Sequence, residues 1–327
     1  MQLKRTRTIN IKYVIKPFIH EDKNWKELIQ IVSDSKKILP TLIEKDYWIM
    51  HTLWSLSNSG LSYFMKGGTS LSKAYRVIDR FSEDIDLLIE DESLRSQTAR
   101  KDTSPKNVEK RKKFFDGLTT RIQVPGAVNI ERNKDFDSDH LINAGIVVSY
   151  NSSNQVEGVK SGILLEIGFD TVEPWEEKNI SSWIIDYLEK TEQLKDFFDN
   201  RALSVRCYRP EYTFVEKLQA ISTKYRQLAE GLDISNFARH YYDVYKLLEL
   251  PNIQKFIGSE KYIEHKNNRF RSKDEKNLTK NDAFILNNPN MFKQIEDRYE
   301  KTKAIYYGKV PRLQEIIESL KPHLSKM

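Results

Sequence analysis

The chain has 327 residues, of which 39% are hydrophobic and 31% charged, with a net charge of +6. This balance excludes an intrinsically disordered chain, and the absence of an apolar run near the ~18 residues of a membrane span excludes a membrane protein. The single cysteine, Cys207, excludes an internal disulfide. Because the N-terminus also lacks the apolar core of a signal peptide, we expect a soluble, cytoplasmic globular protein.

The first third of the chain predicts three helices and two strands. Two of the helices lie within residues 23–58, and the second of these, which begins after Pro40, has an apolar side. A short aromatic strand at 62–66 ends at two glycines, and apolar spacing over 69–80 predicts a helix after them. Residues 84–89 then predict a second strand.

The remaining elements predict an α/β (α+β) fold with a mixed sheet. After a polar loop we expect a helix near 107–120, strands at 127–131, 141–150, 162–169 and 202–208, and a helix at 181–198. Cys207 falls in the last strand, where we expect it to be a buried packing residue. From residue 210 the pattern is helical. We therefore expect a core domain of residues 1–208 with a helical lead-in, and a helical domain of residues 209–327.

The junction between the first strand and its helix has the character of a phosphate-binding turn. It contains Gly67 and Gly68, which let the backbone approach a ligand closely or adopt positive φ. Thr69 and Ser70 follow, where a helix N-terminus offers unpaired N–H groups beside two hydroxyls. Most such turns bind no phosphate, so the neighbouring residues decide whether this one is a binding site.

Two aspartates, Asp84 and Asp86, follow about fifteen residues after the glycines. Because strand side chains alternate, both carboxylates share one face, with α-carbons roughly 6–7 Å apart. At that separation both can reach one Mg²⁺ or bridge two ions. A lone Asp-x-Asp is usually a solvated strand face, but after a phosphate-binding turn it predicts a site for a nucleotide with magnesium.

These motifs resemble the AbiEii/AbiGii-type toxins, which include the MenT-like enzymes, within the nucleotidyltransferase superfamily. The resemblance rests on KGGTSL at 66–71 and RFSEDIDL at 80–87. Upstream, IEKDYW at 43–48 looks like the family's leading helix; downstream, EKLQA at 216–220 resembles its lysine helix and RHYYDVYKL at 239–247 its Arg-Asp-x-x-Asp-like helix. The chain departs from the pattern at His240, where many members carry an aspartate, so only Asp243 carries a role over.

The resemblance implies a toxin that transfers a nucleoside monophosphate from an NTP to a hydroxyl, with two Mg²⁺ ions as cofactors. It suggests a tRNA 3′ end as acceptor, growth arrest as the result, and a separately encoded antitoxin protein as partner. It assigns metal binding to Asp84 and Asp86, contact with the triphosphate to Lys217, and a place in the active site, orienting Lys217, to Asp243. The nucleotide-binding candidates are Lys66, Gly67, Gly68, Thr69, Ser70, Arg80, Ser82 and Lys217.

A third carboxylate is expected on a neighbouring strand. Glu166 is the candidate, because a charge in the middle of an apolar strand is costly without a partner such as a metal or an arginine. It would activate the acceptor hydroxyl by metal coordination or as a general base. Asp170, at the strand end, is the alternative. For Asp243 the alternative role is an ion pair with Arg239, four residues earlier.

Two other functions stay open at this point. One is transfer of a nucleotidyl or phosphoryl group to a protein side chain; the other is a non-catalytic toxin that only binds NTP. Basic runs at 106–113 and 255–280 favour an RNA acceptor, although each run taken alone is as well explained by a solvated surface.

Overall fold

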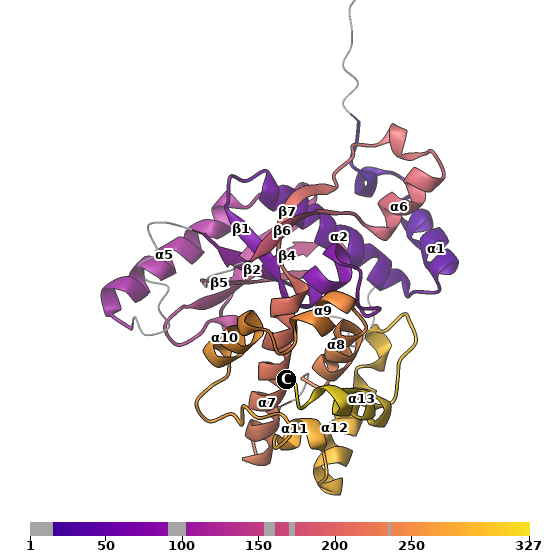
Figure 1. Ribbon diagram of the computed structural model, residues 1–327. Coiled ribbons are helices and arrows are strands. Elements are labelled where there is room, and N and C mark those ends of the chain that lie inside the picture. Colours follow the sequence, from indigo (N-terminus) through magenta and orange to yellow (C-terminus); the bar gives the residue numbers. More distant parts are fainter. Residues whose placement is uncertain (1–15, 91–102, 154–160, 170–173, 235–236) are drawn as a thin grey trace, which may run out of the picture.

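The computed structural model describes residues 16–90, 103–153, 161–169, 174–234 and 237–327. A seven-stranded sheet forms one part of the molecule, and the helices after residue 209 form a second part beside it (Figure 1). The sheet is mixed, which confirms the expected fold class. Its strands are β1 Tyr63–Lys66, β2 Asp84–Ile89, β3 Ala127–Asn133, β4 Asn143–Tyr150, β5 Ile163–Gly168, β6 Trp175–Ile180 and β7 Ala202–Tyr208.

The strand order β3-β4-β5-β2-β1-β7-β6 puts β2 at the centre of the sheet. Strand β2 pairs antiparallel with β1 and parallel with β5, and β1 pairs parallel with β7. The antiparallel pairs β3–β4, β4–β5 and β6–β7 complete the sheet. A central strand is covered on both faces, which explains why Ile85, Leu87, Leu88 and Ile89 are all buried although they alternate in direction.

The helices around the sheet are α1 Trp25–Lys36, α2 Pro40–Ser57, α5 Pro105–Arg121 and α6 Trp183–Lys190, and a short turn, α3 Gly67–Thr69, continues as a π-helical turn over Ser70–Ala74. The second part contains α7 Pro210–Ala229, α8 Arg239–Leu248, α9 Pro251–Phe256, α10 Glu260–Arg269, α11 Asp282–Ile285, α12 Pro289–Lys301 and α13 Leu313–Leu320. Several begin with proline, because the fixed φ of proline suits the first turn and its missing N–H would have no helical partner there.

Three expectations about these elements were wrong. Strand β6 was missed, because an exposed edge strand with the sequence WEEKNI lacks an apolar signal. The helix expected at 181–198 ends at Lys190. The helix expected at 69–80 begins at Gly67 and is over by Ala74, after which Arg76 takes a left-handed φ of 54° and the chain leaves the helical path.

The sequence pattern of helix α2 predicted one apolar side, but the helix is buried nearly all round. It carries three buried charged residues in succession, each with a partner. Glu44 accepts hydrogen bonds from Ser152 and Ser153, Lys45 pairs with Glu83 at 3.1 Å, and Asp46 pairs with Lys73 at 2.5 Å. Since Glu83 precedes β2 directly, these contacts fix α2 against the central strand.

The two larger hydrophobic clusters of the described residues divide near residue 208, and a small third one contains Phe64, Leu88 and Tyr208. Of the two larger clusters, one contains buried residues between Ile19 and Cys207, and the other contains residues from Phe214 to Met327 together with Leu71 and Ile78. The division of the chain into domains of residues 1–208 and 209–327 stays a prediction, with Leu71 and Ile78 crossing that boundary. Cys207 is buried, as expected, and burial raises the pKa of its thiol to about 12. In the described ranges, no helix combines the length and apolar character needed to cross a bilayer.

Candidate active site

A pocket of about 340 Å³ lies where strands β1, β2 and β5 meet the helices of the second part. Its volume is in the range of small-ligand sites. Most of the candidates from the sequence line it, and Thr69, Ser70 and Asp243 are the three that do not. Its lining consists of Lys66, Gly67, Gly68, Arg80, Ser82, Asp84, Asp86, Glu166, Thr213, Glu216, Lys217, Gln219, Ala220, Arg239, His240 and Arg269.

The sheet supplies an acidic floor to this pocket. Asp86 is in register with Lys66 on β1 and with Glu166 on β5, so these three side chains lie side by side on one face. Asp84, two residues before Asp86, shares that face. Burial raises the pKa of Asp86, and the nearby Asp84 adds to this effect while the ammonium groups of Lys66 and Lys217 oppose it.

The two glycines lie directly against the acidic floor. A methyl group on Gly67, whose φ is +70°, would stand 1.9 Å from Oδ2 of Asp86. One on Gly68 would stand 2.6 Å from Oγ of Ser82 and 2.9 Å from the Arg80 guanidinium. Both contacts are too short for any side chain, so the turn requires glycine because polar pocket groups approach its backbone closely.

Thr69 and Ser70 are placed differently from the expectation that their hydroxyls hold phosphates. Both side chains are completely buried and outside the pocket lining. The Thr69 hydroxyl donates to the backbone carbonyl of Asp84 and thereby holds the start of β2. The Ser70 hydroxyl has no hydrogen-bond partner among the described residues. These two hydroxyls face the protein interior, so Thr69 supports the floor from behind.

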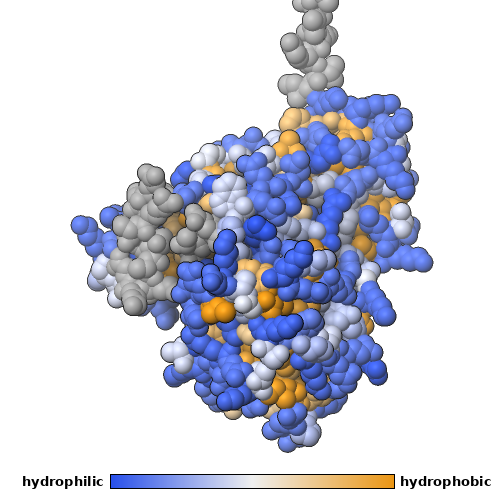
Figure 2. Space-filling view, viewed as in Figure 1, coloured by the Kyte–Doolittle hydropathy of each residue, from blue (hydrophilic) through white to orange (hydrophobic). Residues whose placement is uncertain are grey.

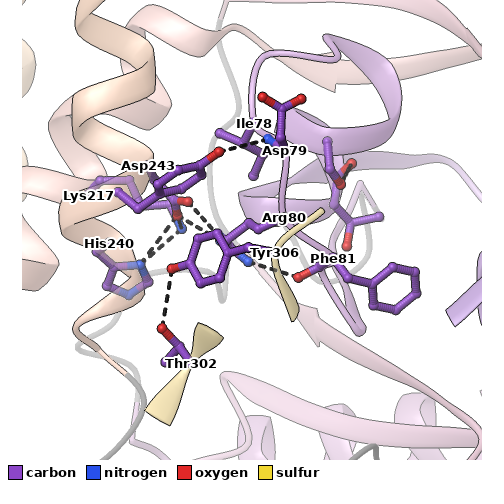
Figure 3. A network of polar contacts seen from close by, with 12 residues as sticks. Ile78, Asp79, Arg80, Phe81, Lys217, His240, Asp243, Thr302 and Tyr306 are labelled. Atoms are coloured by element: carbon purple, nitrogen blue, oxygen red, sulfur yellow. Dashed lines mark hydrogen bonds and ion pairs between the residues drawn. The ribbon is translucent and has the colours of Figure 1, made fainter. Parts of the chain in front are cut away.

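Asp243 organises the cationic side of the site from a fully buried position (Figure 3). It accepts two hydrogen bonds from Arg80, at 2.6 and 2.7 Å, and pairs with Lys217 at 3.1 Å. Burial alone would raise the pKa of Asp243, but the charges of Arg80 and Lys217 hold it well below its usual range. In the described part of the chain Asp243 does not pair with Arg239, the alternative partner. Its contact with Lys217 is the one expected from the family resemblance.

Helix α7 presents one face to the pocket. Thr213, Glu216, Lys217 and Ala220 follow the i, i+3, i+4, i+7 spacing of a single helix side, and all four line the pocket. Lys217 is only 10% exposed. Burial lowers the pKa of its ammonium group, and the ion pair with Asp243 opposes that effect. The helix therefore places a largely desolvated cation opposite the acidic floor.

Sequence reasoning missed three charged residues of the pocket: Glu216, Arg239 and Arg269. Glu216 lies between two cations, 3.2 Å from Arg269 and 3.8 Å from Lys66. Helical spacing around Lys217 could have identified Glu216, and Arg239 begins the motif that contains Asp243. Arg269 was one of many basic residues in the run at 255–280, and nothing in the sequence distinguishes it from the others.

Asp84, Asp86 and Glu166 are the residues of the pocket that could hold a cation. Within the described ranges, no group of three or more Asp, Glu, His or Cys side chains is gathered closely enough to hold a metal unaided. Magnesium is commonly held by one or two carboxylates together with substrate phosphates and water. The carboxylates of the pocket could supply part of the coordination of a magnesium ion, with the remaining ligands coming from the phosphates of a nucleotide and from water. Asp170, the alternative third carboxylate, lies outside the described residues.

Comparison with known proteins gave one match. No curated protein and no solved structure is detectably similar to this chain. The family described as nucleotidyl transferase AbiEii toxin, type IV TA system, matches residues 48–319. This range includes every residue of the pocket and extends through both parts of the structure. The chain therefore belongs to the AbiEii nucleotidyltransferase toxin family.

Proposed function

We propose that this toxin transfers a nucleoside monophosphate from a magnesium-bound NTP to a hydroxyl of an RNA acceptor, the 3′ end of a tRNA. In this reaction the acceptor oxygen bonds to the α-phosphorus, the bond from that phosphorus to the bridging oxygen breaks, and pyrophosphate leaves. The observation that carries the proposal is that one pocket holds the three sheet carboxylates, Asp84, Asp86 and Glu166, together with the helix cations Lys217, Arg239 and Arg269. Such a combination suits a polyanionic substrate that arrives with a divalent cation.

The carboxylates have separate roles in this proposal. Asp84 and Asp86 would hold magnesium, which when bound neutralises phosphate charge and orients the reacting groups. Glu166, in register with Asp86 on the adjacent strand, takes the proton of the attacking hydroxyl. Gly67 and Gly68 leave the room that the carboxylates and the phosphates share. All of these groups come from the sheet, so strand register sets their spacing.

The cations stabilise the charge that develops on the leaving pyrophosphate. Lys217 reaches the pocket from α7, and Arg80 reaches it from the segment before β2. Both are held by Asp243 before any ligand binds. Preorganised cations cost no reorganisation during the reaction, and this is the usual source of rate enhancement in phosphoryl and nucleotidyl transfer.

Two features favour RNA as the acceptor. Helix α5 carries the exposed Lys106, Lys110, Lys112 and Lys113, while Arg111 of the same run is buried and donates to the carbonyl of His140. Helix α10 ends at Arg269, which lines the pocket. Hydrophilic residues also cover most of the face of the molecule in Figure 2. Exposed lysines on the sheet part of the molecule, and an arginine in the pocket itself, suit binding to a polyanion.

The test is incubation of the protein with Mg²⁺, total tRNA and each α-labelled NTP in turn. The proposal expects label on tRNA that disappears in Asp84→Ala/Asp86→Ala and persists in the surface control Glu296→Ala/Asp297→Ala. Label on protein would move the acceptor to a side chain, and label only from γ-labelled NTP would indicate a kinase-like reaction. No labelled product, with NTP binding intact, would favour a non-catalytic toxin. Blocking of the tRNA 3′ hydroxyl by the added nucleotide would explain growth arrest in the cytoplasm under control of an antitoxin.

A further inference from the structure

His240 occupies a position in the pocket for which the proposed reaction has not yet given a role. It follows the first residue of α8, lines the pocket, and keeps 18% of its side chain exposed. Its Nδ1 lies 3.3 Å from Nζ of Lys217 and 3.6 Å from Oδ2 of Asp243. Figure 3 shows the ring beside these two side chains.

The contact with Lys217 determines which ring nitrogen carries the proton. A lysine ammonium has three donors and no acceptor, so Nδ1 of His240 must accept this hydrogen bond. The carboxylate of Asp243 lies farther from Nδ1, at 3.6 Å, and already accepts from Arg80 and pairs with Lys217. In a neutral imidazole the nitrogen that does not accept carries the hydrogen. The proton of His240 is therefore on Nε2.

The imidazole also stays neutral over the physiological range. Burial, together with the adjacent charge of Lys217, lowers the pKa of His240 to about 3. Among the described residues no group hydrogen-bonds to Nε2. His240 thus presents an N–H donor on the wall of a pocket that the cationic residues Lys217 and Arg239 also line. Neighbours that only donate favour a ligand that only accepts, which is a phosphate and not a nucleobase edge.

We propose that Nε2–H of His240 donates a hydrogen bond to a phosphate oxygen of the bound NTP, while Lys217 fixes the ring by donating to Nδ1. This inference rests on the proposed function, since it needs a nucleotide in the pocket. It makes His240 a binding residue for the triphosphate and Lys217 a group with two roles, one toward the ligand and one toward the ring.

Two isosteric variants separate the two nitrogens. The amide of His240→Asn reaches the level of Nδ1 and can still accept from Lys217, whereas the amide of His240→Gln reaches the level of Nε2 and can still donate into the pocket. Binding is measured by calorimetry with Mg²⁺ and the non-hydrolysable α,β-methylene analogues of the four NTPs, and with the corresponding nucleosides. His323→Gln, outside the pocket lining, is the composition control.

We expect His240→Gln to bind the preferred NTP analogue within about 3-fold of the wild type, and His240→Asn and His240→Ala to bind about 10-fold more weakly, since hydrogen bonds to charged groups are worth that much or more. Nucleoside binding should be unchanged throughout. Affinity kept by Asn and lost by Gln would overturn the proposal, because the ring would then act only through Lys217. Equal losses for nucleosides would also overturn it.

A measurement without substitutions guards against variants that fail to fold. A two-bond ¹H–¹⁵N spectrum of the wild type reports the tautomer of each histidine, and we expect protonated Nε2 for His240. Protonated Nδ1 would contradict the proposal even if all variants were unstable. If the wild type bound no NTP analogue, the proposed function itself would fail. If the wild type bound the analogue, but His240→Asn kept the affinity and His240→Gln lost it, only the proposed role of His240 would fail.

Discussion

Removing Asp243 is expected to destabilise the protein more than removing Arg80, although each change breaks the same buried ion pair. The side chains of Arg80 and Asp243 are 1% and 0% exposed, and Lys217, the second partner of Asp243, is 10% exposed. Asp243→Leu leaves two cations buried beside each other without a counter-charge. Arg80→Met leaves Asp243 with Lys217 still 3.1 Å away.

The magnitudes follow from the cost of stranding a buried charge. Breaking a buried pair by removing one partner costs about 3–5 kcal/mol, and we assign Asp243→Leu to this range or above it. For Arg80→Met we expect about 1–3 kcal/mol, because the remaining hydrogen-bonded pair still neutralises the carboxylate. The double variant should cost less than the sum of the two, since loss of the Asp243 carboxylate strands no arginine once Arg80 has also been replaced.

Urea unfolding of the three variants measures these free energies by linear extrapolation. Asp297→Leu is the control, because Asp297 is 55% exposed and pairs with an exposed lysine at 2.9 Å, and such pairs contribute under about 1 kcal/mol. If Asp243→Leu cost no more than Arg80→Met, the reasoning from a stranded pair of cations would be refuted.

Three further predictions concern other parts of the structure. Gly67→Ala should lose transferase activity and at least about 1 kcal/mol of stability, because the φ of Gly67 is +70° and the new methyl group would meet Asp86. The control Gly117→Ala, in helix α5 with no atom within 4 Å of the new methyl group, should raise the melting temperature. Equal effects of the two substitutions would contradict the close approach of Asp86 to Gly67. His51 is buried, and burial lowers its pKa from 6.5 to about 4, so His51 alone should account for about 2 kcal/mol of the stability lost between pH 7 and pH 5. His51→Leu should reduce that loss by about this amount in urea titrations, while the shares of His20 and His240 remain; an unchanged pH dependence would contradict the assignment to His51. Glu216→Gln should tighten NTP binding several-fold in calorimetry, because the carboxylate pairs with Lys66 and Arg269, two cations that we propose to face the triphosphate. Weaker binding would show that Glu216 itself holds the ligand.

The part of the site that the sequence predicts is the part set by local geometry. Alternation along a strand is enough to place Asp84 and Asp86 on one face. The pairing of Asp86 with Glu166 is different. It depends on β5 lying beside β2 in parallel and in a particular register, and no local property of either strand specifies a partner some eighty residues away.

Burial produced the other differences between sequence and structure. Thr69 and Ser70 have the residue types of a phosphate-binding turn, but they follow the two glycines of the turn, and both of their side chains are buried. Arg80 was expected to meet phosphate, and it does line the pocket, yet its two strongest contacts go to Asp243, 163 residues later in the chain. Contacts at that separation are decided by how the two parts of the molecule pack, which the sequence pattern does not show.

The same long-range contact explains how the geometry of the pocket can be kept between the two larger hydrophobic clusters. Arg80 lies four residues before Asp84, donates to the carbonyl of Phe81, and is held by Asp243 on α8. Asp243 in turn holds Lys217 on α7. The position of Lys217 relative to the carboxylates on β2 is therefore set by the contacts among Arg80, Asp243 and Lys217, and not by the apolar contacts between the clusters. Apolar packing tolerates small shifts because it has no preferred direction, whereas a two-point arginine–carboxylate contact fixes both distance and orientation. Because burying two charges carries a desolvation penalty, the Arg80–Asp243 pair adds little net stability, and its main effect is to align the two sides of the pocket.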